Sequence, residues 1–298
     1  MPSQTMFIDF EIDTPQGGAL TGRRFPIEAV AETIDDEALV TAVLKSLRGL
    51  AAGQVTIRGK HPGTGPNYVT DAASDQFGEG CRIDLSHVIE DGMITYKGLP
   101  APLICDHLSR QASREHYDPG TEFQIDRINM VGNTGTYLDT PFHRYQDGAD
   151  LADLPLSSIS DCPGVVIDVR ASPGRLIDCA LLAAAEIRGR AVLLRTGWDK
   201  HWRTDQYFED HPYLSEQGAI YLRDRGARLV GIDSMNIDDI RGGTRPVHSI
   251  LLGAGIPIVE HMTRLDQLPS GPFRFFAVPP KIRNAGTFPV RAHAIMSP

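Results

Sequence analysis

An aspartate and a histidine stand four residues apart in a stretch whose backbone is restricted. Asp139 and His143 lie on either side of Pro141, and Gly132 and Gly135 precede them. A carboxylate and an imidazole at this spacing can bind a divalent metal ion or move a proton. Proline fixes the backbone angle φ and donates no hydrogen bond, so neither a central strand nor a helix interior fits here. We therefore expect a strand that runs into a tight loop carrying both groups.

The residues ahead of this stretch alternate between apolar and polar from Phe123 to Met130. A period of two is typical of a strand that buries one of its faces. We expect this half-buried strand to lead into the loop.

The segment from Asn133 to His143 resembles the signature of the cyclase family, which runs His-x-Gly-Thr-His-x-Asp-x-Pro-x-His. This family includes bacterial kynurenine formamidases, isatin hydrolases and some dienelactone hydrolases. Five positions match in register, namely Gly135, Thr136, Asp139, Pro141 and His143. Asn133 and Tyr137 depart from the signature, because typical members have metal-binding histidines at both positions.

Two further residues agree with the family far along the chain. In relatives a Pro-x-His motif opens a helix, a glutamate twelve residues later ends the next strand, and both residues bind metal. Here His248 follows Pro246, and Glu260 follows an apolar run, so the positions match without a gap. The resemblance covers about residues 82–296, and it implies metal ligands at Asp139, His248 and Glu260.

The departures at Asn133 and Tyr137 change what such a site can bind. A neutral amide oxygen is a weak ligand, and a phenol with a pKa of about 10 must lose its proton before it binds metal well. The resemblance therefore implies one site of a histidine and two carboxylates, suited to Mn, Fe or Zn, in place of a binuclear centre. It also implies that His143 acts as general base and acid, with Tyr137 and Asn133 as further catalytic candidates.

Three functions from different classes stay open. The first is a hydrolase or cyclase-like enzyme that acts on an amide, lactone or ring of a small carbonyl substrate with one divalent ion, Zn or Mn. The second is a metal-free cyclase, lyase or isomerase in which His143, Tyr137 and a carboxylate do the acid/base work. The third is a non-catalytic relative that binds a small molecule. The agreement of His143 with Asp139, His248 and Glu260 favours an enzyme.

Aromatic residues gather after the sequence Thr196–Trp198, which closes an expected strand as it does in the family. Trp198 and Trp202, with Thr136 of the signature, are our candidates for substrate binding. The aromatic cluster is equally consistent with a small core of its own. For His87, at the end of a strand pattern, we expect a structural or hydrogen-bonding role.

The main domain is expected to be α/β, because strand patterns alternate with helical ones. Expected strands cover residues 164–169, 191–195, 229–233 and 256–259, and helices are expected after Asp178 and near 215–225. The resemblance implies the swivelling β/β/α fold of the cyclase family for this domain, residues 81–298.

Residues 1–80 lie outside the resemblance, and we expect a small, β-rich α+β extension and a linker there. Strand patterns cover residues 6–13, 24–30 and 54–58, a helix is expected over 36–50, and a glycine- and proline-rich cluster at 61–66 indicates a loop. Such a segment packs on the main domain or builds an oligomer contact. We expect a homo-oligomer, a dimer or a tetramer.

Composition narrows the partners and the compartment. The chain has 298 residues and a net charge of −9, which argues against nucleic acid or an anionic membrane as partner. No apolar run approaches the ~18 residues of a spanning helix, and the first residues lack the features of a secretion signal. The four cysteines, Cys81, Cys105, Cys162 and Cys179, are widely scattered and are interpreted as reduced thiols. We expect a cytoplasmic protein with a small-molecule substrate.

Overall fold

The computed structural model describes residues 4–13, 19–29, 55–62, 81–171 and 174–296, with the backbone alone in the first three of these segments. The chain divides into two compact units. The first unit holds Met1–Asp71, Ile89–Ile94 and Gly98–Val131, and the second holds Ala72–Val88, Thr95–Lys97 and Gly132–Pro298. The domain boundary predicted at residue 80 stays a prediction.

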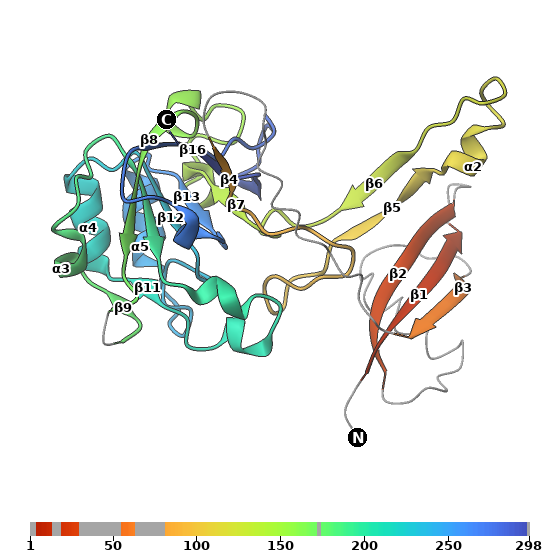
Figure 1. Cartoon of the computed structure of the whole chain (residues 1–298), viewed down its shortest axis with the longest axis horizontal. Helices are drawn as coiled ribbons and strands as arrows, with labels where there is room; N and C mark the ends of the chain where they lie inside the picture. The colour runs from red at the N-terminus through yellow and green to blue at the C-terminus, as the bar shows by residue number, and fades with distance from the viewer. Residues whose placement is uncertain (1–3, 14–18, 30–54, 63–80, 172–173, 297–298) are drawn as a thin grey trace. The chain divides into compact units, whose positions relative to one another are not determined.

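A three-stranded antiparallel sheet with the strand order β2-β1-β3 belongs to the first unit (Figure 1). Its strands are β1, Gln4–Asp13, β2, Ala19–Ala29, and β3, Val55–Pro62. All three were predicted from the sequence. β3 continues two residues into the predicted loop, and Pro62 is tolerated there because β3 is an edge strand of this sheet. The helix predicted over 36–50 lies outside the described residues.

The first unit also contains an antiparallel hairpin of β5, Leu103–Leu108, and β6, Ile125–Asn129. The short helix α2, Arg110–Ser113, lies in the connection, and the Ser109 side chain caps it. Every residue of β6 is exposed. The predicted strand is therefore present, but the prediction that it buries one face is wrong, because β6 pairs with β5 in a sheet of only two strands.

Nine strands form one sheet in the second unit, in the order β15-β7-β13-β12-β10-β8-β14-β16-β4 (Figure 1). The four central strands are parallel: β8, Cys162–Asp168, β10, Ala191–Arg195, β12, Leu229–Ile232, and β13, Ile258–Glu260. The flanking strands are antiparallel: β7, Tyr137–Asp139, β15, Thr287–Pro289, β14, Phe273–Phe276, β16, His293–Met296, and β4, Arg82–Asp84. This arrangement confirms the predicted α/β class.

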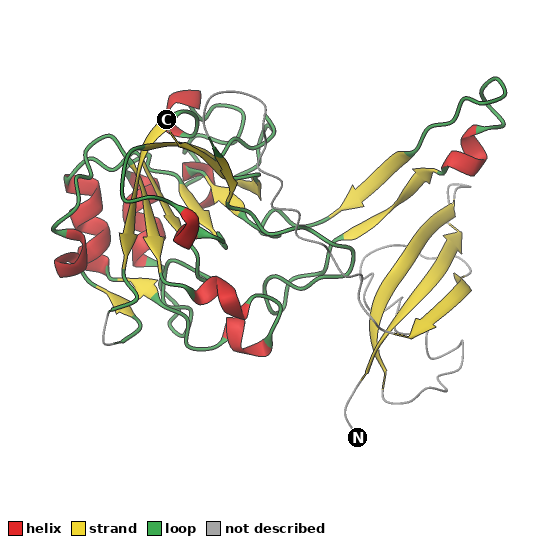
Figure 2. Cartoon of the chain, in the orientation of Figure 1, coloured by secondary structure: helices red, strands yellow, loops and turns green. Residues whose placement is uncertain are grey.

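Short helices connect the strands of this sheet (Figure 2). They are α3, Cys179–Leu182, α4, Glu216–Asp224, and α5, Pro246–Gly253. Asp178 and Ser215 cap α3 and α4 through side-chain oxygens that accept from backbone N–H groups, as their residue types favour. Single 3-10 turns cover Pro141–His143, Leu156–Ser158, Trp198–His201, Asp205–Phe208 and Leu265–Gln267, and a small parallel ribbon pairs β9, Leu176–Ile177, with β11, Tyr213–Leu214.

Alternate residues of the central strands pack into two separate cores. Leu193 of β10 belongs to one core, whereas its neighbour Val192 belongs to the other. The second core, here called the helix-side core, also holds Leu182 of α3, Leu222 of α4 and Leu251 of α5, all fully buried. Burying a leucine completely stabilises a fold by about 1.5–3 kcal/mol relative to leaving it exposed. The helices are thus held on the sheet by the strand residues of one parity.

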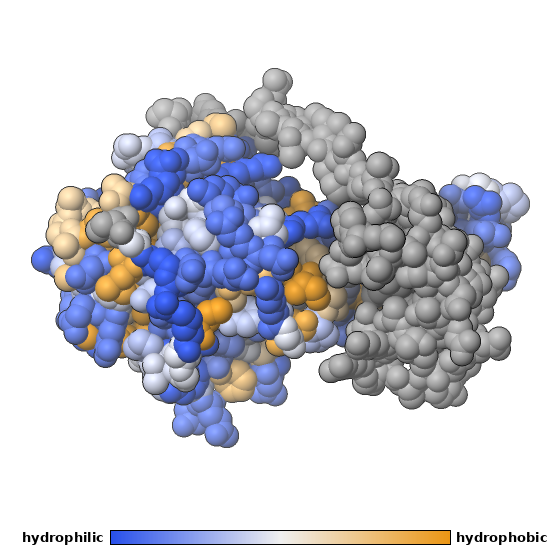
Figure 3. Space-filling view, turned by 90° about the horizontal axis from the view of Figure 1, so that it is seen from below, coloured by the Kyte–Doolittle hydropathy of each residue, from blue (hydrophilic) through white to orange (hydrophobic). Residues whose placement is uncertain are grey.

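Among the described residues, no helix has the length and hydropathy that crossing a membrane requires. On the face shown in Figure 3, the coloured surface is mostly hydrophilic, and hydrophobic side chains form small separate groups. All four cysteines are free thiols, as expected.

Candidate active site

The register of β7 and β13 places three candidate residues on one face of the sheet. Tyr137 pairs with Glu260, and Asp139 pairs with Ile258. Residues two apart on a strand share a face, and so do cross-strand partners. Tyr137, Asp139 and Glu260 therefore share the face that Ile258 contributes to the helix-side core. All three side chains are buried.

His248 reaches the same place from the first turn of α5. Its Nδ1 lies 2.6 Å from Asp238 Oδ2, which also accepts the backbone N–H of His248. The other oxygen of Asp238, Oδ1, accepts the backbone N–H of Val247. Asp238 thereby fixes both the start of α5 and the orientation of the imidazole. The other ring nitrogen, Nε2, lies 3.6 Å from Asp139 Oδ2 and 3.7 Å from Glu260 Oε1.

These spacings fit a shared cation better than direct hydrogen bonds. Contacts of 3.6–3.7 Å exceed the 2.7–3.2 Å of an N–H···O bond. Ligand atoms ~2.0–2.2 Å from one tetrahedral ion would stand roughly 3.4 Å apart. Asp139 Oδ2 is buried and has no hydrogen-bond partner among the described residues. His248 Nε2 thus stands at ligand spacing from one oxygen of Asp139 and from one oxygen of Glu260, but the three residues together do not form a described group whose ligand atoms all lie within 4.8 Å of one another.

His143 lies in the 3-10 turn Pro141–His143, directly after β7. The stretch predicted to be a tight loop thus contains a strand of the main sheet followed by a turn. Thr287 Oγ1 donates a short hydrogen bond to Asp139 Oδ1 and lies 2.8 Å from His143 Nδ1. Because the threonine proton goes to Asp139, the threonine oxygen must accept from His143 Nδ1–H. The lone pair of the neutral imidazole is then on Nε2, as a general base requires.

Asp139, His143 and His248 also have possible ligand atoms within 4.8 Å of one another. This set differs from the predicted ligand set, in which Glu260 takes the place of His143. The hydrogen bond with Thr287 places the proton of neutral His143 on Nδ1, so Nε2 is the nitrogen that could bind a metal ion or take up a proton. In the proposal below we assign His143 Nε2 to proton transfer and Glu260 to the ion.

Glu260 and Tyr137 form a buried hydrogen-bonded pair. The Tyr137 hydroxyl donates to Glu260 Oε2 at 2.6 Å, and the backbone N–H of Ile237 donates to Glu260 Oε1 at 2.6 Å. Burial, and next the negative charge of Glu260, raise the pKa of Tyr137 well above its usual value of 10, whereas a hydrogen bond from Asn133 works in the opposite direction. Tyr137 is therefore a neutral phenol at physiological pH and, in this state, a poor metal ligand.

The carboxylates around His248 require positive charge. Burial opposes the imidazolium form, but interactions with Asp139, Asp238 and Glu260 outweigh burial and raise the pKa of His248 to about 10. Burial also raises the pKa of Glu260, an effect that the charge of His248 opposes. Either a proton on His248 or a metal ion can supply this charge.

The predicted substrate-binding residues lie in different surroundings. Thr136 Oγ1 donates to the backbone oxygen of His261 at 2.5 Å and accepts from the N–H of His87 at 3.0 Å, so it braces two loops. Trp202 stacks on His87 with ring centroids 3.9 Å apart and lies 5.6 Å from His261. Trp198 instead donates to the backbone oxygen of Tyr207 at 3.1 Å. Their roles in substrate binding stay predictions.

Three residues of the site were missed by the sequence analysis. Asp238 and Thr287 fix the two histidines, and His261 packs against Tyr137 with ring centroids 5.1 Å apart. Neither a loop aspartate nor a threonine has a local signal for such a role. His261 could have been noticed from its place directly after Glu260.

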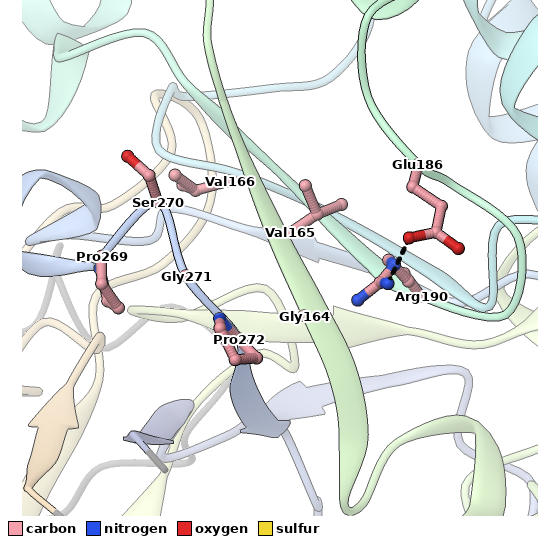
Figure 4. A pocket seen from close by; sticks show the side chains of 9 residues that line it. All are labelled: Gly164, Val165, Val166, Glu186, Arg190, Pro269, Ser270, Gly271 and Pro272. Carbon is pink, nitrogen blue, oxygen red and sulfur yellow. Dashed lines mark hydrogen bonds and ion pairs between the residues drawn. The ribbon is translucent and has the colours of Figure 1, made fainter. Parts of the chain in front are cut away.

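A separate surface hollow of about 270 Å³ lies away from this site (Figure 4). It is lined by Gly164–Val166, the Glu186–Arg190 ion pair and the loop Pro269–Pro272. Gly164 lies near the amino end of β8, and Arg190 directly precedes β10. Ligands of open α/β sheets bind outside the carboxyl ends of strands, so this hollow does not mark the active site.

A family described as "Putative cyclase" matches residues 83–239, just over half of the 298 residues. A kynurenine formamidase of Bacillus cereus is 27% identical over 219 residues, which cover 70% of this chain and 95% of the relative. A kynurenine formamidase of Geobacillus thermodenitrificans is 34% identical over 170 residues, which cover 56% of this chain and 78% of the relative.

Solved structures show the same fold. Isatin hydrolase A from Labrenzia aggregata, bound to benzyl benzoate, aligns with a TM-score of 0.63 and 23% identity over 73% of this chain and 94% of its own. A potential metal-dependent hydrolase with cyclase activity aligns with a TM-score of 0.56 and 27% identity over 73% of this chain and 98% of its own. The predicted cyclase-like fold is thereby confirmed.

Proposed function

The chain belongs to the cyclase family and is an enzyme of the hydrolase or cyclase type, and we propose that it hydrolyses an amide or lactone bond of a small carbonyl substrate with one divalent ion, Zn or Mn. The observation that carries this proposal is the position of His248 Nε2, which lies 3.6 Å from Asp139 Oδ2 and 3.7 Å from Glu260 Oε1, with Asp139 Oδ2 unpaired among the described residues. The ion would be held by these three residues. When bound, it polarises the carbonyl and lowers the pKa of water towards ~7.

The residues of the chain transfer the proton and hold the catalytic groups in position. The Nε2 lone pair of His143 takes a proton from the attacking water, while Thr287 and Asp139 hold the ring through Nδ1. As the bond from the carbonyl carbon to nitrogen or oxygen breaks, His143 returns the proton to the leaving atom. The products are a carboxylic acid and an amine or alcohol. The Tyr137 phenol keeps Glu260 in place.

A metal-free enzyme on the same scaffold is the second candidate. The raised pKa of His248, about 10, allows an imidazolium to balance the surrounding carboxylates without an ion. Tyr137 and Asn133 replace residues that bind metal in typical members. In such an enzyme, His143 and the Tyr137 phenol would act as base and acid in a cyclase, lyase or isomerase reaction.

Our first prediction separates the two candidates. Metal content is measured on protein purified without added metal, and hydrolysis of aryl formamides, lactones and isatin is followed with and without a chelator. We expect one equivalent of metal, and activity that the chelator abolishes and Zn or Mn restores. Full activity in chelated protein without metal contradicts the metal-dependent proposal and favours the second candidate.

The same assay tests the general base. His143→Ala is expected to lower turnover by ~10²–10⁴, the usual contribution of a positioned base, with metal content retained. His107→Ala is the matched control, because His107 is exposed and belongs to the hairpin strand β5. Turnover near the wild-type value in a folded His143→Ala protein removes His143 from the mechanism.

A further inference from the structure

Arg144 directly follows the proposed base and is fixed by a contact with α5. Its Nε donates to Ser249 Oγ at 3.1 Å, and Ser249 directly follows His248. The Ser249 hydroxyl donates to the backbone oxygen of Arg245 at 2.8 Å, so its oxygen is free to accept from Arg144. The guanidinium therefore stands where the turn that carries His143 meets the helix that carries His248.

Tyr145 supports the same guanidinium from one face. The central carbon of the Arg144 guanidinium lies 5.3 Å from the centre of the tyrosine ring, within the range of a cation–π contact. The Tyr145 hydroxyl donates to the backbone oxygen of Ser249 at 2.8 Å. Gly253, one turn further along α5, leaves room for this ring, because a Cβ atom there would lie 3.2 Å from the tyrosine oxygen. Two neighbours thus hold a side chain that is itself exposed.

The outer edge of the Arg144 guanidinium has no partner. Within the described part of the chain only its Nε donates a hydrogen bond, and no carboxylate there forms an ion pair with this arginine. Both Nη atoms therefore remain as a fork of parallel donors, the geometry that binds a carboxylate through two hydrogen bonds. Arg245, the other arginine at the start of α5, is different, because its Nη1 lies within hydrogen-bond distance of three backbone oxygens of its own loop.

We propose that the Nη fork of Arg144 binds a carboxylate of the substrate that lies outside the reacting bond. The proposal rests on the function proposed above and names the substrate class as small carbonyl compounds that carry a carboxylate. About a third of the His143 side chain is exposed, so the site is open to solvent beside Arg144. The chain has a net charge of −9 and repels anions at long range, so a carboxylate needs a local cation to be held here. A fork that is anchored before binding loses little side-chain entropy when the carboxylate binds.

The test compares benzamide with its three carboxylated forms, the ortho, meta and para carbamoylbenzoates. Binding is measured by titration calorimetry in the His143→Ala background, so that no amide is hydrolysed. We expect at least one carbamoylbenzoate to bind more tightly than benzamide, and this preference should fall as salt is added. Arg144→Gln is expected to reduce the preference about three- to tenfold, less than for a buried pair, because water reaches the fork.

Arg225→Gln is the matched control. Arg225 is also exposed and also lies on a tyrosine, with its guanidinium 5.1 Å from the ring centre of Tyr221. It follows α4 and precedes the amino end of β12, whereas Glu260 of the active site is the last residue of β13. The change removes the same charge away from the site, so it should leave the preference unchanged.

The outcomes separate this inference from the proposed function. Carbamoylbenzoates that bind no more tightly than benzamide, binding of no probe, or a preference that Arg144→Gln leaves unchanged overturns the carboxylate site, whatever the turnover. An equal loss of preference in Arg225→Gln also overturns it, because the effect then comes from net charge alone. A preference that depends on Arg144 in a protein that hydrolyses nothing keeps this site and overturns the hydrolase. If Arg144→Gln does not fold, Ser249→Ala, which removes only the anchor of Nε, should weaken the preference, and an unchanged preference in that variant overturns the site.

Discussion

At the scale of single residues, the hydrogen bond from Thr287 gives the two oxygens of Asp139 different roles. The threonine hydroxyl occupies Oδ1 and, through the same oxygen, accepts from His143. Oδ2 has no hydrogen-bond partner in the described part of the chain and lies 3.6 Å from His248 Nε2. One carboxylate therefore orients the proposed base with one oxygen and is available to a cation with the other.

The second prediction concerns Asp238 and the metal affinity of the site. It holds His248 Nδ1 at 2.6 Å and accepts two backbone N–H groups at the start of α5. In Asp238→Asn only one oxygen remains for the Val247 N–H at Oδ1 and for the His248 N–H and Nδ1 at Oδ2, so part of this support is lost, and so is the negative charge beside the imidazole. We expect a 10- to 100-fold loss of metal affinity, a typical effect of removing the partner of a ligating histidine, measured by competition with a fluorescent zinc chelator.

Asp239→Asn is the control for this change. Asp239 is the next residue, but its carboxylate pairs with Arg241 on the surface. Thermal unfolding of both variants shows whether the helix start is intact. An equal fall in metal affinity in the two variants would mean that Asp238 does not act through His248.

The third prediction concerns the two departures from the family signature. If Asn133 and Tyr137 replaced ligands of a second ion, the double variant Asn133→His and Tyr137→His should rebuild that site, because neutral imidazoles bind Zn and Mn well. We expect one additional metal equivalent by elemental analysis. Glu260 loses the hydrogen bond from Tyr137 at the same time, so native activity should fall. Two tight equivalents in the wild type would refute our interpretation of both substitutions.

At the scale of the elements, a short antiparallel pair brings the signature to the rest of the site. β7 is only three residues long, yet its pairing with β13 sets Tyr137 beside Glu260. α5 begins at Pro246, a residue favoured in the first turn, and places His248 over the same face. The sequence predicted β13 from its apolar run and the start of α5 from the family's Pro-x-His spacing, because both signals are local, but it predicted a tight loop where β7 lies.

The remaining contacts could not be predicted, because they join positions that no local pattern relates. Thr287 lies 148 residues beyond Asp139, and Tyr207 lies 54 residues before His261. For β6, the local pattern predicted the element correctly but its burial wrongly. Its alternation correctly predicted a strand, but burial depends on what packs against the strand, and this hairpin has only two strands.

The fourth prediction concerns the effect of pH on His87, which follows β4 and stacks on Trp202. Burial, and next the positive charge of Arg264, lower the pKa of His87 to about 3. An unfolded chain protonates this histidine below pH ~6.5, whereas the folded protein does not, so stability is lost as pH falls from 6.5 towards 3. The contribution is roughly 1.4 kcal/mol for each pH unit.

His87→Phe isolates this contribution, because phenylalanine keeps the stacking on Trp202 and does not titrate. Urea unfolding at pH 7, 6, 5 and 4 should show a shallower loss of stability in the variant than in the wild type. The exposed His107 supplies the control, since His107→Phe should leave the slope unchanged. Parallel slopes for wild type and His87→Phe would contradict the prediction.

At the scale of the whole molecule, exposed apolar side chains are unevenly divided between the two units. Six of the eleven large hydrophobic residues that are exposed in the described part of the chain belong to the first unit: Ile94, Leu99, Tyr117, Phe123, Ile125 and Ile128. The first unit contributes far fewer described side chains than the second. Four of these six, Tyr117, Phe123, Ile125 and Ile128, belong to the hairpin of β5 and β6 or its connection, and exposed apolar side chains that adjoin one another mark protein–protein contact surfaces.

The fifth prediction is therefore that the hairpin of β5 and β6 builds a contact between copies of this chain. Ile125 and Ile128 of β6 are 49% and 56% exposed, and a hairpin of two strands is marginally stable on its own. These two side chains lie on opposite faces of β6, because they are three residues apart, and a second copy packed around the hairpin would cover both and stabilise it. We expect light scattering to show a dimer or a tetramer.

The double variant Ile125→Lys and Ile128→Lys should have a smaller mass, because burying two lysines without partners is unfavourable. Asp126→Lys, exposed in the same strand, is the control for added charge. A monomeric wild type would contradict the prediction, and an oligomer that survives both lysines would place the contact elsewhere, so that the exposure of both faces of β6 would have to be explained by a different partner.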